Sequence, residues 1–345
     1  MNINNIKNIL HTKEYEFLND DINLGENIIL LGLGGSYAYG TNTESSDIDI
    51  RGIATNKARD ILIGKDFEQV VDIKTDTTIY SFDKIVKLLC SANPNVVEIL
   101  GLKPEHYFLL TDAGKKLLDN RQLFLSKRAV YSFGGYAASQ LRRLENFTAR
   151  NTSQSQLEKH ILKSIEHASV DFKSRYFDMP EDSIKLYIDK SPRDDYDTEI
   201  FCDVTLKHYP LRDHKGMLND MGTIIHQYAK MGKRNSKAFQ KNKIAKHSMH
   251  LVRLYLMAFD ILEKGEINTY REKDHDFLMD IRNGKYLDDN QQPTKEFYEI
   301  VDELEAKLDK LKDTTDLPDT PDMDKVMDLI EEVNGDVVNK NVLPY

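Results

Sequence analysis

The sequence predicts an α+β protein in which a small unit of strands and helices, residues 1–110, precedes a largely helical region, residues 111–345. Short apolar or alternating runs typical of strands dominate the first part, whereas apolar residues recur at helical spacing through most of the second. A chain of 345 residues is long enough for one large domain or two ordinary ones, and a hydrophobic content of 40% suits a globular protein. We therefore expect a head followed by a mostly helical domain.

The elements expected in the head follow from the local periodicity and from its breaks. Ser81 suits the N-cap of a helix, and Asn93-Pro94 breaks that helix and can start the next one. In chain order we expect an amphipathic helix over 3–19, a buried strand over 28–33, an extended run over 47–54, a further strand over 67–80 and a helix after residue 81.

The helical region is interrupted by an irregular insertion around residues 180–215. Three prolines mark it, and strand-like runs lie inside it at 184–188 and 200–206. We expect helices over 113–125, 127–149, 154–178, about 244–263, about 274–283, 294–312 and 322–333.

The composition favours a cytoplasmic protein whose surface is not basic as a whole. The net charge of −10 argues against nucleic-acid binding over the entire surface. Cys90 and Cys202 show no spacing typical of a metal or redox site, which fits a reduced cytoplasm. No apolar run approaches the roughly 18 residues of a membrane helix, and the N-terminus has no secretion signal. We therefore expect no membrane partner.

Residues 28–54, IILLGLGGSYAYGTNTESSDIDIRGIA, carry the strongest functional signal. A strand that ends in Gly34-Gly35-Ser36 and leads into a helix leaves free N–H groups that can hold a phosphate. In the run Asp47-Ile48-Asp49-Ile50, a period of two puts both carboxylates on one face of a strand. Such carboxylates repel one another unless a cation lies between them, and Mg²⁺ commonly takes carboxylates together with substrate phosphates. An ordinary turn and a solvated strand face are the alternative.

This stretch resembles the signature of the DNA-polymerase-β-like nucleotidyltransferase superfamily. The resemblance is carried by Gly35-Ser36, Gly40 and Ser46-Asp47-Ile48-Asp49-Ile50, in the order and spacing of that signature. It implies a small mixed-sheet nucleotidyltransferase domain with a two-metal site, whose third carboxylate lies on a neighbouring strand.

Asp72 and Asp76 are the candidates for that third carboxylate. By parity they lie on one face of the strand expected over 67–80. We favour Asp76, because it lies beside Thr77-Thr78-Ile79, where the strand propensity is highest. A surface position for Asp76 is the alternative.

Lys246, His250 and Arg253 indicate where the helical region could meet a phosphate. Their i, i+4, i+7 spacing places them along one face of the helix expected over 244–263. Three potentially cationic groups in a row would suit a triphosphate or an RNA backbone, and a solvated face paired with acids is the alternative. Residues 230–247 hold seven Lys or Arg and no acid, which fits either a phosphate-backbone contact or a basic loop.

The chain resembles one branch of the superfamily in particular, the RNA-repair-pathway polymerase-β-like nucleotidyltransferases. The aromatic residue beside the Gly-Ser helix is Tyr39 here, where Trp is often found. The branch motifs occur in the order Arg51, Asp76 to Glu98 with Asn93-Pro94, Lys246 to Leu254, Gly265-Glu266-Ile267 and Ile281-Arg282-Asn283-Gly284. This resemblance favours an RNA end as the acceptor.

The residues and the resemblance together predict metal-dependent transfer of a nucleoside monophosphate from an NTP such as ATP to a hydroxyl acceptor. Asp47, Asp49 and Asp76 would hold two Mg²⁺ ions, for which Mn²⁺ could substitute. Gly35 and Ser36 would hold phosphates of the NTP. Nucleotidylation of a protein or a small molecule is one alternative, and a non-catalytic nucleotide sensor is another.

Overall fold

The computed structural model describes residues 3–149, 183–190, 192, 198–216, 218–219, 241–289 and 291–342. The chain forms two compact units, one of residues 1–141 with 245–345 and the other of residues 142–244. The helix expected over 154–178 and residues 230–240 of the basic stretch lie outside the described residues. Across the part of the chain that is described, no helix is long and apolar enough to cross a membrane.

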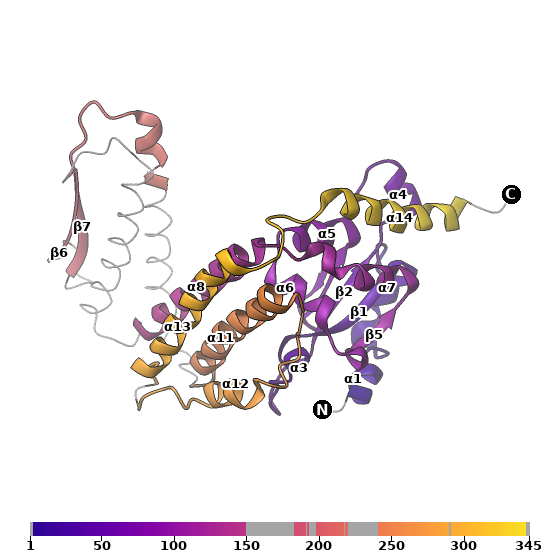
Figure 1. Ribbon diagram of the computed structural model, residues 1–345, viewed down its shortest axis with the longest axis horizontal. Helices are drawn as coiled ribbons and strands as arrows, with labels where there is room; N and C mark the ends of the chain where they lie inside the picture. The colour runs from indigo at the N-terminus through magenta and orange to yellow at the C-terminus, as the bar shows by residue number, and fades with distance from the viewer. Residues whose placement is uncertain are drawn as a thin grey trace. The chain divides into compact units, whose positions relative to one another are not determined.

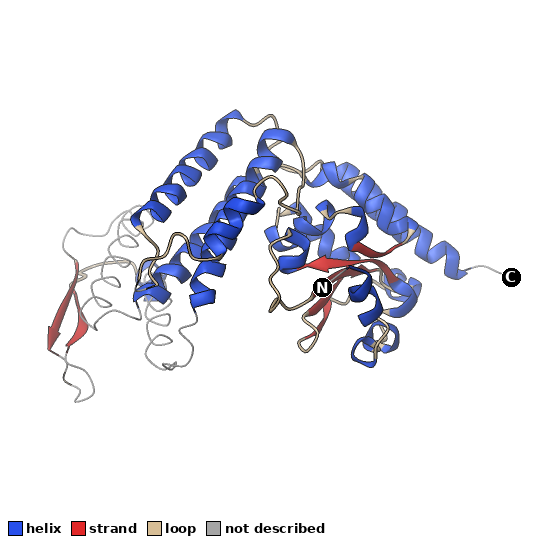
Figure 2. Ribbon diagram, turned by 90° about the horizontal axis from the view of Figure 1, so that it is seen from below, coloured by secondary structure: helices blue, strands red, loops and turns tan. Residues whose placement is uncertain are grey.

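The N-terminal part of the first unit contains a mixed five-stranded sheet with the strand order β3-β4-β2-β1-β5. Figure 1 labels three of its strands, β2, β1 and β5, and Figure 2 shows the strands of the chain in red. β1 pairs antiparallel with β2 and β5, and β4 pairs parallel with β2 and antiparallel with β3. Every residue of β1 is buried, which explains why its sequence is apolar throughout. The strands are β1 (Ile28–Gly34), β2 (Asp49–Ala54), β3 (Gln69–Asp72), β4 (Thr77–Ser81) and β5 (Tyr107–Leu110).

Helices pack around this sheet and make up most of the chain that follows it. α3 packs on β1 and β2, α5 on β2 and β4, and α7 on β1 and β5. The described α-helices are α1 (Ile3–Ile9), α2 (Phe17–Asp20), α3 (Gly35–Tyr39), α4 (Ala58–Leu62), α5 (Phe82–Cys90), α6 (Pro94–Val97), α7 (Asp112–Asp119), α8 (Arg128–Ala149), α11 (Lys241–Lys264), α12 (His275–Arg282), α13 (Lys295–Thr314) and α14 (Met323–Val342). The prediction of an α+β fold is confirmed, and the boundary near residue 110, which would follow β5 directly, stays a prediction.

The helix starts expected at Ser81 and Asn93 are present. Ser81 Oγ accepts a hydrogen bond of 3.1 Å from the backbone N–H of Lys84 at the start of α5. Asn93 Oδ1 accepts one of 3.1 Å from the N–H of Asn95, and Pro94 occupies the first turn of α6. In the second unit, the two strand-like runs form an antiparallel hairpin, β6 (Ile184–Lys190) and β7 (Thr198–Val204).

The single strand predicted over 67–80 is wrong, because the chain forms a hairpin there. β3 ends at Asp72 and β4 begins at Thr77. The Asp72 carboxylate accepts hydrogen bonds of 2.9 Å from the backbone N–H and the hydroxyl of Thr75, which closes the turn. Asp76 has a φ of +45°, in the left-handed region. The face parity assumed between Asp72 and Asp76 therefore does not hold.

The extended run predicted over 47–54 begins two residues late, at Asp49. The ladder stops there because Gly34, the partner of Asp49, is the last residue of β1, and the chain turns into α3 at Gly35. Residues before Asp49 have no β1 residue left to pair with. Asp47 is consequently an exposed loop residue and does not share a strand face with Asp49.

Candidate functional site

The turn from β1 into α3 needs glycine at position 35 for two separate reasons. Gly35 has a φ of +57°, which L side chains rarely adopt. A Cβ on Gly35 would also lie 1.7 Å from Oδ2 of Asp49, the residue that pairs with Gly34 across the sheet. The glycine thus leaves room for a carboxylate directly against the turn. Ser36 follows in α3, where it is buried.

Asp49 and Asp76 form the centre of the site, and we refer to them as the carboxyl pair. Asp49 begins β2, and Asp76 precedes β4, the parallel neighbour of β2. The backbone N–H of Ile50 donates to the carbonyl oxygen of Asp76 over 3.2 Å, which fixes the two strand starts side by side. The two carboxyl groups are close enough for each to change the pKa of the other. The Asp49 side chain is 19% exposed and that of Asp76 is 58% exposed, so the pair opens to solvent on the Asp76 side.

Arg51 supplies a positive charge to the carboxyl pair from within β2. Its Nη2 lies 3.2 Å from Asp76 Oδ1 and 3.6 Å from Asp49 Oδ1. Its Nη1 donates to the carbonyl oxygens of Asp76, over 2.6 Å, and Ile50, over 2.9 Å. One guanidinium therefore fixes both the side chain and the main chain of Asp76, the residue with the positive φ.

Burial and mutual repulsion give the carboxyl pair an unusual protonation. Burial, followed by the hydrogen bond and the charge of Asp76, raises the pKa of Asp49 to about 7. The hydrogen bond from Asp49, together with the charge of Arg51, lowers the pKa of Asp76. The pair thus shares one proton up to nearly neutral pH, as expected of two carboxylates that lack a full counter-charge.

This arrangement suits a divalent cation better than a proton, because two carboxylates on adjacent strand starts are typical Mg²⁺ ligands. Asp47, the third predicted ligand, lies in the loop two residues before β2 and is exposed. Among the described residues, no three acidic, histidine or cysteine side chains are grouped to hold a metal ion. Of the predicted metal ligands, the structure thus brings together Asp49 and Asp76, and the role of all three stays a prediction.

The three predicted phosphate-binding residues of α11 have different surroundings. Lys246 is exposed, and its charge lowers the pKa of both members of the carboxyl pair, so it lies near them. His250 is half-buried with its ring edge-on to Tyr39, 6.0 Å between centroids. Burial, followed by the charges of Arg253 and Lys246, holds the pKa of His250 well below its usual value. Arg253 is buried.

Arg253 joins α11 to the head through a buried group that the sequence did not reveal. Its guanidinium carbon lies 3.6 Å from the centroid of the Tyr39 ring, and its Nη1 lies 3.4 Å from Oε2 of Glu98. The Tyr39 hydroxyl donates to the same oxygen over 2.8 Å. Burial raises the pKa of Glu98, whereas Arg253 and Tyr39 favour its charged form. Glu98 and Tyr39 belong to the branch motifs, but their pairing with Arg253 spans too much sequence for spacing to predict.

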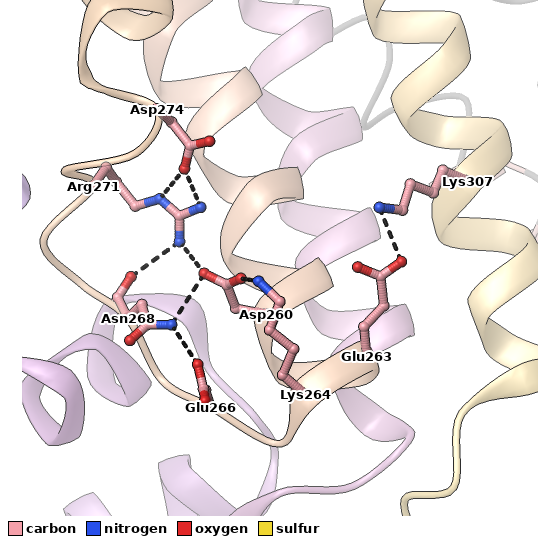
Figure 3. Close-up of polar contacts among 8 residues, drawn as sticks. All are labelled: Asp260, Glu263, Lys264, Glu266, Asn268, Arg271, Asp274 and Lys307. Atoms are coloured by element: carbon pink, nitrogen blue, oxygen red, sulfur yellow. Dashed lines mark hydrogen bonds and ion pairs between the residues drawn. The ribbon is translucent and has the colours of Figure 1, made fainter.

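The loop between α11 and α12, residues 265–274, is hydrogen-bonded to Tyr39 and Glu98 and is stabilised by ion pairs. The backbone N–H of Arg271 donates to the Tyr39 carbonyl over 3.0 Å, and the hydroxyl of Thr269 donates to the carbonyl of Glu98 over 2.6 Å. Figure 3 shows the Arg271 guanidinium between the carboxylates of Asp260 and Asp274. This network fastens the loop to α11, so the loop can hold Tyr39 in place.

The sheet, the Gly35-Ser36 turn and the carboxyl pair are the features of a polymerase-β-like nucleotidyltransferase. Residues 5–168 match the model of the RNA repair pathway DNA polymerase beta family. This segment, which contains the whole five-stranded sheet, is therefore similar to that family, and the predicted resemblance is confirmed.

The chain is also similar to a phage protein whose activity is not known. An uncharacterised 38.9 kDa protein from the nrdC–mobD intergenic region of enterobacteria phage T4 is 32% identical over 119 residues. The match covers 31% of this chain and 35% of the phage protein. No solved structure matches the chain.

Proposed function

We propose that the protein transfers a nucleoside monophosphate from an NTP to a hydroxyl group at an RNA end. In this reaction the hydroxyl oxygen forms a bond to the α-phosphorus, the bond between the α-phosphorus and the bridging oxygen breaks, and pyrophosphate leaves with the electron pair of that bond. The observation that carries the proposal is the carboxyl pair beside the Gly35 turn, in a segment that matches a family of RNA-repair polymerases.

Asp49 and Asp76 are the residues that would hold Mg²⁺ or Mn²⁺, and Asp47, two residues before Asp49, is the third predicted ligand. When bound, the metal would lower the pKa of the attacking hydroxyl and stabilise the leaving pyrophosphate. Arg51 keeps the two carboxyl groups together through its contacts with both. The raised pKa of Asp49 supports a role in cation binding, because burial and then the neighbouring Asp76 disfavour the charged carboxylate, which a divalent ion would stabilise.

Lys246 is the basic residue best suited to meet the triphosphate. It is exposed, it lies near the carboxyl pair, and it has no ion-pair partner among the residues that the structure describes. An exposed ammonium next to a metal site is suited to neutralise phosphate charge that the metal leaves uncompensated. The family match and the basic stretch 230–247 favour RNA as the acceptor.

The test is transfer of label from each of the four α-³²P NTPs in the presence of Mg²⁺, total RNA and cell protein. We expect label in RNA, and we expect RNA affinity to fall steeply as the salt concentration rises. Label in protein alone would refute the RNA acceptor while leaving nucleotidyl transfer intact. Label in neither would refute the proposed function.

The substitution Asp49→Asn tests whether the carboxyl pair is the site of transfer. It removes one charge of the carboxyl pair without changing its shape, and we expect it to abolish nearly all transfer. Asp112→Asn is the control, because Asp112 is 87% exposed and its ion-pair partner among the described residues is Lys115 on its own helix. Wild-type transfer by a folded Asp49→Asn variant would show that the site lies elsewhere.

A further inference from the structure

Arg282, at the end of α12, carries a positive charge that no described carboxylate balances by an ion pair. Its Nη2 donates to the hydroxyl of Ser46 over 3.2 Å. Its Nη1 is buried and has no hydrogen-bond partner in the part of the chain that the structure describes. Within the described ranges, no carboxylate lies at ion-pairing distance from it. Burial alone lowers the pKa of Arg282, which is the effect expected of a cation removed from water without a counter-ion.

Two buried guanidinium groups of this unit, unlike the half-buried Arg282, have carboxylate partners, although the Nε of Arg253 also has no hydrogen-bond partner among the described residues. Arg253 meets Glu98, and Arg271 lies between two carboxylates (Figure 3). A buried charge without a partner costs free energy, and so does a buried N–H without an acceptor. Arg282 has both defects, so its position is explained better by a ligand than by stability.

Cationic side chains and the Ser46 hydroxyl lie near Arg282. The charges of Arg253, Lys246 and Arg282 all act on the half-buried His250 and lower its pKa. The Ser46 hydroxyl accepts from Arg282 and from the backbone N–H of Thr43, the latter over 2.8 Å. Such a region attracts an anion with acceptor oxygens. Ser46 directly precedes Asp47 and is three residues from Asp49, so the anion would lie at the proposed nucleotidyl-transfer site.

We propose that Arg282 and Ser46 form a subsite for a phosphate group of the nucleotide substrate. The free Nη1 and the bound Nη2 belong to one planar fork, the geometry that binds phosphate oxygens in pairs. The Ser46 hydroxyl would orient the guanidinium and donate its own proton to the phosphate. This assignment rests on the proposed function, because it takes the nucleotide as the ligand.

The test measures binding rather than turnover, with the full chain, Mg²⁺ and the α,β-methylene analogues of the four NTPs, in which a carbon replaces the oxygen that would leave. We expect Arg282→Gln to weaken analogue binding about 10- to 100-fold, because it removes charge-assisted hydrogen bonds. We expect Arg282→Lys to recover only part of this loss, because an ammonium lacks the planar fork. Lys285→Gln is the control: it removes an exposed charge three residues away, whose partner is Asp280, and should change affinity no more than about twofold.

A second measurement separates binding from a merely structural role. Without nucleotide, Arg282→Gln should unfold at a temperature no lower than the wild type, since it removes an unbalanced buried charge. A lower unfolding temperature with unchanged analogue affinity would overturn the subsite, and so would a loss confined to RNA binding. If the wild type binds none of the four analogues, both the subsite and the proposed function fail; if it binds and Arg282→Gln binds equally well, only the subsite fails.

Discussion

Replacing Asp49 by Asn should stabilise the first unit at about pH 8 while it abolishes activity. In the folded chain the Asp49 carboxyl has a pKa of about 7, against an ordinary value of 3.8. Between about pH 4 and about pH 7 the unfolded chain therefore releases this proton while the folded chain retains it. The free energy of unfolding falls as the pH rises through that window, because the folded state binds more protons. Asparagine cannot ionise, so the free energy of unfolding of the variant does not fall in this way.

The magnitude follows from the size of the pKa change. A rise of about three units corresponds to an upper limit of about 4 kcal/mol. About half of this is a realistic expectation, because Asp76 is more than half exposed and its lowered pKa offsets part of the cost. Relative to the wild type, we expect the variant to gain about 2 kcal/mol at about pH 8 and almost nothing at about pH 5.

The assay is amide hydrogen exchange of β1 and β2 in EDTA at the two pH values. Exchange reports the opening of these strands alone, which matters because a chain with two compact units need not unfold in one step. Adding Mg²⁺ at about pH 8 should slow exchange in the wild type and leave the variant nearly unchanged. An equal difference at both pH values, or a variant that is less stable at about pH 8, would refute this account of the carboxyl pair.

Three further substitutions probe the contacts around the site. Gly35→Ala should lower the free energy of unfolding, measured in urea, by at least about 2 kcal/mol more than the control Gly64→Ala. Both glycines have a positive φ, but only a Cβ on Gly35 would clash with Asp49. Equal losses for the two variants would count against this clash. Tyr39→Phe should cost about 1 to 2 kcal/mol in the same assay by removing a donor from the buried Glu98, and a neutral result would mean that the carboxylate is satisfied without it. Arg51→Gln should destabilise β2 by about 1 to 2 kcal/mol, as measured by amide exchange, because it removes the counter-charge of the carboxyl pair. The loss should be larger at about pH 8 than at about pH 5, and a loss that does not depend on pH would contradict this role of Arg51.

Local chemistry made the turn and the helix starts predictable from the sequence. The Gly35-Ser36 turn and the Ser81 and Asn93 caps depend on residues within a few positions of one another, and the structure has all of them. Asp76 was favoured for its strand propensity, yet it occupies a turn, and it meets Asp49 through the parallel pairing of β2 and β4. That pairing is a property of the sheet and leaves no trace in the spacing of residues along the chain.

Contacts between charged residues that lie far apart in the chain could not be predicted from the sequence. Helical spacing places Lys246, His250 and Arg253 along α11, but it does not indicate how deeply each side chain is buried. The partners that set this depth lie far away in sequence: Arg253 and Glu98 are 155 residues apart. Arg282 and Ser46, which are 236 residues apart, are a more extreme case. Only the fold shows which basic side chains have a partner and which do not.

The burial gradient along α11 explains why the head and this helix form one compact unit. At one end Lys246 is exposed beside the carboxyl pair, one turn further His250 is half-buried against Tyr39, and at the next turn Arg253 is buried against Glu98. The buried contact is strong because each partner would otherwise be an unpaired polar group in the core. It therefore holds the exposed end of the same rigid helix at a fixed place over the carboxyl pair. Without α11, the head would lose both the counter-charge of Glu98 and the ammonium of Lys246, so folding and the phosphate binding proposed for this site would depend on the same contact.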